Sequence, residues 1–477
     1  PRSLAAAAKD FDVLSKGDFP HNIVKDRTCL TQVIKDWFIL KSKVVESVVS
    51  DCCKIMLVEA KSYREIISRD NTLTVLEKAI EYCKIDVLSM KQIWHRFKHD
   101  MRNSLNIDIP TSIMTLPQLA FQVLQSKLPK GVELHVPTGD EYDFIRKAQY
   151  GGRVMAKKGV YDEECIYVDV VSEYPSVMWQ YEHPHGPCST VEQIDWTKLG
   201  IYDVSLIFKP CDEHSFSPDK CEKCFLKKEQ YTEFLPRRDD DGRLKHSFLE
   251  KQRGTWSTYD LEIAVDDGYV VEKVYGGYEW KYRSKCFKDF IECVKNIKEN
   301  ASSPSERIIG KLIMNSSYGK LNQKPIDTET FIVPRGVALQ FLEDLKIIDG
   351  DDAGKVIVGS NTIKMPTFQE LDENWEKMIL DIEGENLYPT QNGVFILSGA
   401  RKFLRNHKLQ IRKHAPNMKE IYSDTDSMII LVSSLNGYDP SPHFGTELGK
   451  LDDTVVKGYS GTRLSKVVVA GKKMYAY

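Results

Sequence analysis

The sequence lacks any long apolar run. No stretch approaches the roughly 18 apolar residues that a membrane span needs, and residues 1–30 have no apolar core of a secretory signal. It also lacks a charge excess, since 66 basic and 69 acidic residues give a net charge of −3. We therefore expect a soluble intracellular protein with no membrane partner, and we exclude nucleic-acid binding through overall charge alone. A local basic groove stays open, with Lys472–Lys473, Arg401–Lys402 and Arg237–Arg238 as candidate parts.

A disulfide framework is not indicated either. The 11 cysteines are odd in number, which fits a reduced compartment better than paired disulfides. Cys221 and Cys224 have the CxxC spacing of a zinc site, with Cys211 and His214 nearby, although the spacing of this outer pair is loose. Two readings stay open here: a small structural zinc site, or unliganded thiols in a reduced loop.

Internal repeats and low-complexity tracts are also missing, and the length suits roughly two to four domains. Ser303, Pro304 and Glu306 mark a helix start, as cap, first helical residue and capping-box partner. In chain order we expect a mostly helical part at 30–102, a mixed margin at 103–149, a buried strand at 164–171, an irregular polar insertion at 185–255, a helical hairpin at 284–300 and 303–320, a second polar insertion at 322–392, a strand-like segment leading into a helix at 390–413, and two strands around a turn at 419–432.

Two carboxylates stand one residue apart, Asp424 and Asp426, before the apolar run Met428–Val432. In a strand, such residues point to the same face, where they repel each other unless a cation lies between them. Asp169 ends another apolar strand in the same way. Three converging carboxylates would hold two Mg²⁺ ions about 3.5–4 Å apart, the arrangement of phosphoryl transfer. A lone DxD is also typical of a solvated turn.

The helix after Ser303 carries a polar stripe. Arg307, Lys311, Asn315 and Tyr318 follow at i, i+4, i+8 and i+11 and so share one face, opposite a set of isoleucines and leucine. Arg and Lys one turn apart can cradle a triphosphate, with Asn and Tyr further along near sugar and base. A plain surface helix has the same pattern.

Together these segments resemble family B DNA polymerases. DVVSEYPS (169–176), KLIMNSSYG (311–319) and YSDTDS (422–427) are similar to motifs A, B and C, in that order. QYGGR (149–153) resembles the YxGG motif that links exonuclease and polymerase parts, and KKMY (472–475) resembles the KxY motif. GTWSTYDLEIAVDDGY (254–269), with insertions on both sides of motif B, resembles the protein-primed members of phages, adenoviruses, linear plasmids and Polinton-type elements.

The resemblance implies roles for individual residues. It implies that Asp169 and Asp424 are the principal metal ligands, with the Val170 carbonyl assisting and Asp426 close by, and that Lys311 also belongs to the catalytic set. It implies that Tyr174 lies under the deoxyribose and excludes a 2′-hydroxyl, although a core aromatic is the alternative. The implied nucleotide-binding set is Arg307, Lys311, Asn315, Tyr318, Gly319, Tyr174 and Ser172, and the implied DNA-binding set is Tyr150, Gly151, Gly152, Arg153, Thr425, Lys473 and Tyr475. The alternative for the two glycines is a plain turn.

The implied fold is α/β (α+β): a right-hand palm with an antiparallel sheet and helical-hairpin fingers, preceded by the C-terminal part of a ribonuclease H-like 3′–5′ exonuclease domain. The implied domains are an exonuclease remnant and linker at 1–147, palm at 148–184, a terminal-protein-region-like insertion at 185–255, palm at 256–284, fingers at 285–321, a second insertion at 322–392, and palm at 393–477.

Three departures qualify the resemblance. Glu173 stands where the family motif usually has Leu. Tyr82 and Asp86 resemble the third exonuclease motif, but no DxE precedes them, so we do not expect proofreading. The chain starts at Pro1 and stops at Tyr477, just after the KxY match, so we expect a fragment truncated at both ends and without a thumb.

The function implied is a DNA-directed DNA polymerase of the protein-primed type, serving a virus, linear plasmid or mobile element. Two Mg²⁺ ions, or Mn²⁺, are the implied cofactors. DNA template-primer, dNTP and a terminal protein are the implied partners of a monomer. Two alternatives stay open: a polymerase that uses RNA, and an inactive relic that only binds nucleic acid.

Overall fold

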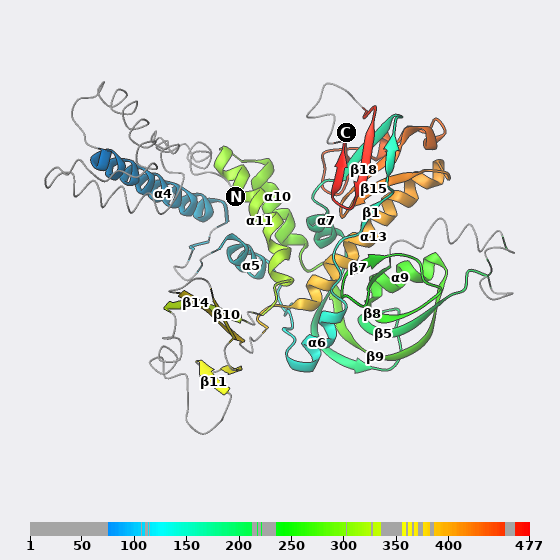
Figure 1. Cartoon of the computed structure of the whole chain (residues 1–477), viewed down its shortest axis with the longest axis horizontal. Coiled ribbons are helices and arrows are strands. Elements are labelled where there is room, and N and C mark those ends of the chain that lie inside the picture. Colours follow the sequence, from blue (N-terminus) through cyan, green and yellow to red (C-terminus); the bar gives the residue numbers. More distant parts are fainter. Residues whose placement is uncertain are drawn as a thin grey trace. The chain divides into compact units, whose positions relative to one another are not determined.

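The computed structural model describes fifteen stretches of the chain (Figure 1). They are residues 75–105, 107–109, 113, 115–211, 217, 221, 235–301, 303–325, 328–334, 355–358, 361–364, 367–370, 375–381, 386–453 and 463–477. These fall into two compact units, the first within 1–112 and 297–310 and the second within 113–296 and 311–477. No helix among the described residues has the length and apolar character to cross a membrane.

The first unit contains the long helix α4 (Val75–Leu105) and the start of α11 (Pro304–Leu321). The predicted cap is confirmed, because Ser303 Oγ accepts a hydrogen bond from the Glu306 N–H at 3.2 Å. The Glu306 carboxylate accepts one from Ser104 Oγ at 2.6 Å, which fixes the end of α4 against the start of α11. The expected helical part is confirmed for α4, whereas residues 30–74 lie outside the described residues.

The second unit is built on an antiparallel five-stranded sheet in the order β1-β15-β16-β3-β17. Its strands are β1 (Val154–Ala156), β3 (Cys165–Val170), β15 (Glu420–Asp424), β16 (Ser427–Leu431) and β17 (Leu451–Asp452). The middle strand β16 is buried along its whole length. One face of the sheet packs against α7 (Glu173–Gln180) and α13 (Thr390–His414), and the other against β18 (Val467–Gly471). Burial on both faces explains the apolar run after Asp426.

Helix α13 corrects an expectation. The predicted strand-like start at residue 390 is helical, and α13 runs unbroken from Thr390 to His414 (Figure 1). Two glycines weakened the helical pattern, since glycine is a poor helix former. Their role is close packing: a Cβ on Gly393 would lie 2.6 Å from the Leu321 carbonyl, and one on Gly399 would lie 2.5 Å from Val177 Cγ1.

The expected irregular insertion at 185–255 is also wrong in part. Much of it is strand: β4 (His183–Val191), β5 (Leu199–Phe208) and β8 (Lys251–Ser257) join β9 (Tyr269–Ser284) in a second antiparallel sheet, in the order β4-β9-β5-β8. The pattern of β4 is hidden by Pro184, Gly186 and Pro187 and by a bulge between His185 and Cys188. The domain boundaries themselves stay predictions.

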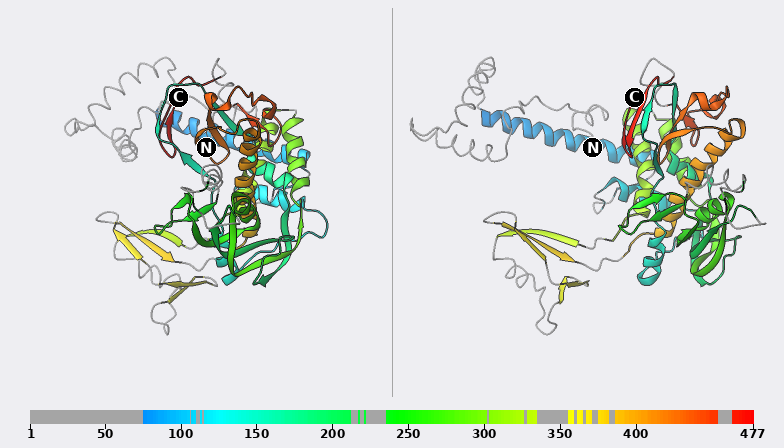
Figure 2. Two further views of the ribbon diagram at one scale, coloured as in Figure 1. Left: turned by 90° about the vertical axis from the view of Figure 1, so that its right-hand side faces the viewer. Right: turned by 45° about the vertical axis from the view of Figure 1, so that its right-hand side comes forward.

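The remaining elements are short (Figure 2). The helices are α5 (Leu116–Ser126), α6 (Gly139–Lys147), α9 (Thr258–Asp267) and α10 (Lys288–Glu299), with 3₁₀ turns at Val432–Leu435 and Ser441–His443. Strand β2 (Gly159–Tyr161) joins β18 and β19 (Met474–Ala476), and β6 (Pro236–Arg238) pairs with β7 (Leu244–His246). The second insertion contains β10 (Thr328–Pro334), β11 (Lys355–Val358), β12 (Asn361–Lys364), β13 (Thr367–Glu370) and β14 (Trp375–Asp381).

Candidate active site

Asp169 and Asp424 flank one small residue of the central strand. Ser427 on β16 pairs with Asp424 on one side and with Asp169 on the other. Directly paired residues point to the same face of a sheet, so both carboxylates stand on the face shared with Ser427. Their Cα atoms are two strand spacings apart, about 10 Å. The sheet thus joins residues that lie about 250 positions apart in the sequence.

Asp426 reaches the same place by a different route from the one expected. It does not share a strand with Asp424: it lies in the two-residue turn between β15 and β16, beside Thr425, whose φ is +58°. Its carbonyl accepts a hydrogen bond from the Val170 N–H at 2.8 Å. Its carboxyl hydrogen-bonds to that of Asp169. The turn between β15 and β16, and not the two-residue repeat of a strand, therefore places the Asp426 carboxylate beside that of Asp169.

The carboxyl groups are crowded enough to change their protonation. Burial raises the pKa of Asp169 to about 7, and the negative charges of Asp426 and Asp452 add to the shift. Burial also raises the pKa of Asp426, with a further contribution from Asp424. Asp452 was not identified from the sequence. Asp452 on β17 pairs directly with Asp169 on β3. In the sequence, this strand is indicated only by one apolar residue, Leu451, before two aspartates.

Glu173 is buried beside this group. Its side chain is 2 % exposed, and neither carboxyl oxygen has a hydrogen-bond partner among the described residues. Burial raises its pKa well above the usual range, and the charges of Asp426 and Asp169 raise it further, against a smaller opposite effect of Arg401. Burial and the neighbouring aspartates therefore both favour the protonated form of Glu173.

The glycine pair at 151–152 supports the turn that holds Asp426. A Cβ on Gly152 would lie 2.5–2.8 Å from the Thr425 side chain, whereas one on Gly151 meets only Leu244 Cδ2 at 3.6 Å. The Thr425 N–H donates to the Arg153 carbonyl at 2.8 Å. Gly152 is thus more than a plain turn, because only glycine allows this close approach.

Arg153 is a buried structural cation. Its guanidinium donates to Glu420 at 2.7 and 3.2 Å and to Ser423 Oγ at 2.5 Å, and Lys408 also bonds to Glu420. Burial alone would raise the pKa of Glu420, but Arg153 and Lys408 together outweigh it and hold that pKa well below its usual range. This network attaches β15 to helix α13 and to the residue that precedes β1. A DNA contact by the Arg153 side chain is difficult, since it is 1 % exposed.

Arg401 also differs from the expectation of a groove residue. It is buried, forms a bidentate pair with Asp260 at 2.9 and 2.8 Å, and donates to the carbonyls of Tyr150 at 2.6 Å and Gly151 at 3.0 Å. Lys402 pairs with Glu262. Arg401 and Lys402 therefore have a structural role, because each pairs with a carboxylate and a buried cation needs such a partner.

Tyr150 instead lines a basic pocket of about 430 Å³. Lys147, Arg237 and Arg238 also line it, so this candidate basic pair does lie on a concave surface. The Arg238 guanidinium is 5.8 Å from the Tyr150 ring and donates to the Gln149 carbonyl at 3.1 Å. We call these four residues the basic pocket.

The segment 472–475 lies against the β15–β16 hairpin. Lys473 Nζ is 3.4 Å from Asp424 Oδ2, and its side chain is 71 % exposed. Its N–H donates to Tyr422 Oη at 3.2 Å, with the backbone held at a φ of +60°. Tyr475 packs on Tyr422, with ring centroids 4.4 Å apart, and its hydroxyl is 3.2 Å from that of Tyr167.

Tyr174 lies in the segment that resembles motif A and Tyr318 in the segment that resembles motif B, and their side chains are in contact. Their rings stack with centroids 4.1 Å apart and an interplanar angle of 26°. Burial raises the pKa of Tyr318, and the negative charge of Asp426 adds to this shift, so the stack lies near the carboxylates. Ser172, just before α7, adopts a left-handed φ of +51°, a strained conformation that is enriched at functional sites.

The other predicted nucleotide contacts lie along α11. Lys311, Asn315 and Gly319 are exposed in the second unit, where no bond links them directly to the aspartates among the described contacts. Arg307 is exposed in the first unit. Their roles stay predictions.

The predicted exonuclease and zinc residues are only partly described. Tyr82 and Asp86 both lie on α4, and their functional origin stays a prediction. Cys211 and Cys221 have Sγ atoms 3.6 Å apart, while Cys224 and His214 lie outside the described residues.

A comparison with known protein families identifies one family that matches this chain. The family described as "DNA polymerase type B, organellar and viral" matches residues 1–409. A DNA polymerase of Kluyveromyces lactis is 28% identical over 496 residues, covering 99% of the chain and 44% of that protein. A probable DNA polymerase of Neurospora intermedia is 25% identical, covering 63% of the chain and 30% of that protein. The chain thus spans less than half the length of these curated relatives.

Solved structures show a similar fold. Phi29 DNA polymerase matches with a TM-score of 0.57 at 18% identity, covering 100% of the chain and 66% of that protein. The same polymerase in complex with primer-template DNA and incoming nucleotide matches with the same score. This likeness confirms the expected polymerase fold of mixed helices and antiparallel sheets.

Proposed function

Since the chain belongs to the organellar and viral type B DNA polymerases, we propose that it carries the polymerase centre of a DNA-directed DNA polymerase. The reaction is nucleotidyl transfer: a primer 3′-hydroxyl attacks the α-phosphate of a dNTP and pyrophosphate leaves. The observation that carries the proposal is the meeting of Asp169, Asp424 and Asp426 at one end of the five-stranded sheet.

The donor set fits divalent cations. Carboxylate oxygens are the ligands that Mg²⁺ prefers. Burial raises the pKa of both Asp169 and Asp426, and neighbouring aspartates add to the shift, so a bound cation would stabilise their charged forms. Asp169 and Asp424 would be the principal ligands, with the Val170 carbonyl and Asp426 beside them. Two bound Mg²⁺ ions would activate the attacking hydroxyl and stabilise the leaving oxygens.

The chain's own residues would then position the nucleotide. The stacked rings of Tyr174 and Tyr318 offer a flat, half-buried floor close to the aspartates, on which a sugar can rest. Lys311 stands exposed on α11 and would neutralise the triphosphate, with Asn315 and Gly319 further along the same helix. Catalysis of this kind depends on positioning and charge neutralisation.

Lys473 and the basic pocket would provide the contacts to the primer and the template. Lys473 reaches Asp424 with an exposed ammonium group, so it would hold the primer terminus at the attacking position. The basic pocket beside Tyr150 would bind the phosphates of the template strand.

We further propose that initiation uses a terminal protein hydroxyl as the first primer, and that the enzyme works as a monomer inside the cell that carries its replicon. The support is the resemblance of residues 254–269 to protein-primed polymerases. The replicon would be a virus, linear plasmid or mobile element.

Primer extension tests the polymerase proposal. The chain, expressed with the sequence that flanks it in its gene, should extend a primed template with Mg²⁺ and dNTPs. Asp424→Asn should lower the rate at least about 100-fold, because a principal metal ligand is lost. Asp241→Asn is the matched control, since Asp241 is an exposed aspartate in the β6–β7 turn, and it should extend at the parent rate.

Equal extension by the parent and Asp424→Asn would refute the assigned role. No extension by either, with DNA binding retained, would favour the inactive relic, for which the buried Glu173 beside the aspartates is the specific observation. Extension with ribonucleotides at the dNTP rate would favour an RNA-making polymerase.

A further inference from the structure

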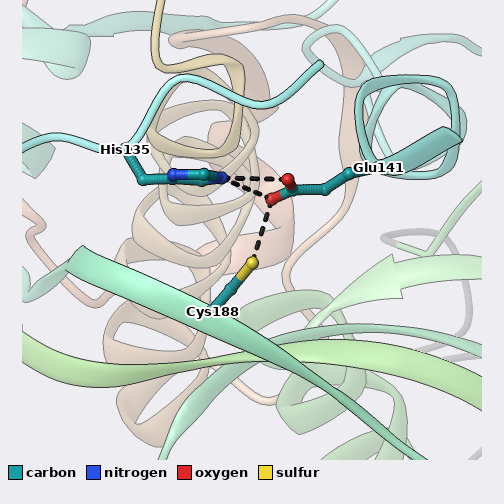
Figure 3. Close-up of side chains that lie close together, drawn as sticks. All are labelled: His135, Glu141 and Cys188. Carbon is teal, nitrogen blue, oxygen red and sulfur yellow. Dashed lines mark hydrogen bonds and ion pairs between the residues drawn. The ribbon is translucent and has the colours of Figure 1, made fainter. Parts of the chain in front are cut away.

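Three side chains with different metal-binding donors meet away from the aspartates. His135 Nε2 lies 2.8 and 2.9 Å from the two Glu141 carboxyl oxygens, and Cys188 Sγ donates to Glu141 Oε1 at 2.9 Å (Figure 3). They come from three segments: the loop before α6, the first turn of α6, and strand β4. We call them the His–Glu–Cys cluster.

The geometry fits a single small cation. One donor atom from each residue lies within 4.8 Å of the other two. A tetrahedral zinc site has bond lengths of about 2.0–2.3 Å, which separates its donors by roughly 3.5 Å. Imidazole, carboxylate and thiolate together suit Zn²⁺ and similar ions better than Mg²⁺. All three residues are half-buried, which leaves a path for the ion and for a water molecule as fourth ligand.

The cluster is formed in advance by backbone contacts that do not involve its side chains. The Gly186 N–H on β4 donates to the Glu133 carbonyl at 2.8 Å, two residues before His135. Gln391 Nε2, from α13, donates to the His135 carbonyl at 2.6 Å. These bonds hold the loop beside β4 whether or not the three side chains interact, so the donors are preorganised.

The local charge also favours a cation. Among the described ion pairs, His135 is the partner of Glu141, and Asp140 and Asp143 lie in the same stretch of α6. The Cys188 thiol donates a hydrogen bond to Glu141 Oε1. That proton must pass to solvent when an ion binds.

We propose that His135, Glu141 and Cys188 bind one zinc-class divalent ion, which fastens the loop before α6 and the start of α6 to strand β4. Binding forms bonds from Nε2, a carboxylate oxygen and Sγ to the ion, and releases the thiol proton. The site shares no residue with the proposed polymerase centre, so either proposal can fail without the other.

Cobalt titration tests the site, because a thiolate bound to Co²⁺ gives a charge-transfer band that carboxylate sites do not give. The parent chain carries Cys211→Ser, Cys221→Ser and Cys224→Ser, so that the candidate CxxC site supplies no thiolate. We expect a band that saturates at one equivalent of Co²⁺ and disappears when Zn²⁺ displaces it. Cys188→Ser keeps a hydroxyl donor to Glu141 but removes the thiolate, and should abolish the band.

Cys293→Ser is the matched control, a half-buried cysteine on α10 outside the cluster, and should titrate like the parent. His135→Gln should weaken Co²⁺ binding by roughly 10-fold or more. No band in the parent, or an unchanged band in Cys188→Ser, would overturn the proposal and leave a hydrogen-bonded cluster only.

If Cys188→Ser fails to fold by circular dichroism, alkylation of the parent decides instead. Iodoacetamide labelling of Cys188, followed by mass spectrometry, should be slower with Zn²⁺ than with EDTA, while labelling of Cys293 stays the same. Equal labelling of Cys188 under both conditions would refute the site.

Discussion

At the scale of single residues, Glu173 is a buried carboxyl group without a hydrogen-bond partner among the described residues. A buried polar group without a hydrogen-bond partner destabilises the folded state by about 1–3 kcal/mol. Glu173→Leu should therefore raise the free energy of unfolding by about this amount, measured by urea denaturation in EDTA. Glu447→Leu, at an exposed position, should change it by less than about 0.5 kcal/mol.

The effect of Glu173 should depend on pH in a defined direction. Its pKa in the folded chain is raised above the ordinary 4.5, so the folded state keeps a proton that the unfolded chain releases. The parent therefore loses stability as pH rises above 4.5, and the gain from Glu173→Leu should be larger at pH 7 than at pH 4. A gain that shrinks with rising pH would contradict a buried neutral acid.

Gly152 makes a second prediction at this scale. Gly152→Ala should push the Thr425 side chain away and move the turn that holds Asp426, because the added Cβ would lie under 3 Å from it. We expect primer extension to fall at least about 10-fold, since small displacements of catalytic groups are costly.

Two variants separate this contact from a general effect of alanine. Gly151→Ala meets only one carbon at 3.6 Å and should keep its activity. Thr425→Gly removes the clashing side chain, and its φ of +58° suits glycine, so the double variant Gly152→Ala/Thr425→Gly should recover activity over Gly152→Ala. No recovery would mean that the loss has another cause.

At the scale of elements, the Arg153–Glu420–Lys408 network attaches β15 to helix α13 and to the residue that precedes β1. Removing one partner leaves buried cations uncompensated, so Glu420→Gln should lower the free energy of unfolding by about 3–5 kcal/mol. Glu262→Gln, in the more exposed pair with Lys402, should lower it by less than about 1 kcal/mol. Similar losses in both variants would show that burial of the network is unimportant.

The pH dependence of this network is opposite in sign to that of Glu173. The pKa of Glu420 is lowered in the folded chain, so its contribution is present above the unfolded value of 4.5 and is lost as pH falls toward the folded value. The difference in stability between parent and Glu420→Gln should therefore shrink on acidification below about pH 4.5.

Elements differ in how well the sequence predicts them. Strand β3, the β15–β16 hairpin and the capped helix α11 follow from apolar runs and local caps, which act over a few residues. Helix α13 and strand β4 do not, because their glycines and prolines satisfy tertiary contacts that no local pattern contains. Likewise, no local pattern predicts that Asp452 pairs with Asp169 or that Glu173 is buried, because both depend on contacts between distant parts of the chain.

At the scale of the whole chain, the small net charge of −3 means that DNA affinity must come from local cations. In the sequence, three pairs of adjacent basic residues are equal candidates for part of a DNA-binding groove. The fold separates them: Arg401 is buried with Asp260, Lys473 reaches Asp424, and Arg237–Arg238 lines the basic pocket. Ion pairing and burial, which the sequence does not contain, decide between a scaffold cation and a DNA-contacting one.

Arg238 is then the residue whose loss should weaken DNA binding through charge alone. Among the described contacts its guanidinium donates to the Gln149 and Gly242 carbonyls and to no carboxylate, so its charge stays available to a phosphate. Arg238→Gln should weaken binding to all DNA sequences alike and reduce the slope of log affinity against log salt by about 1. Fluorescence anisotropy over a salt series measures both quantities.

Two further variants isolate the charge. Arg238→Lys should restore the salt slope, because the positive charge returns, even if the affinity is lower than in the parent. Lys419→Gln removes an equal exposed charge at the end of β15 away from Asp424, and should leave the slope unchanged. If Lys419→Gln and Arg238→Gln reduced the slope equally, DNA would be held by diffuse charge, and the basic pocket would have no special part in template binding.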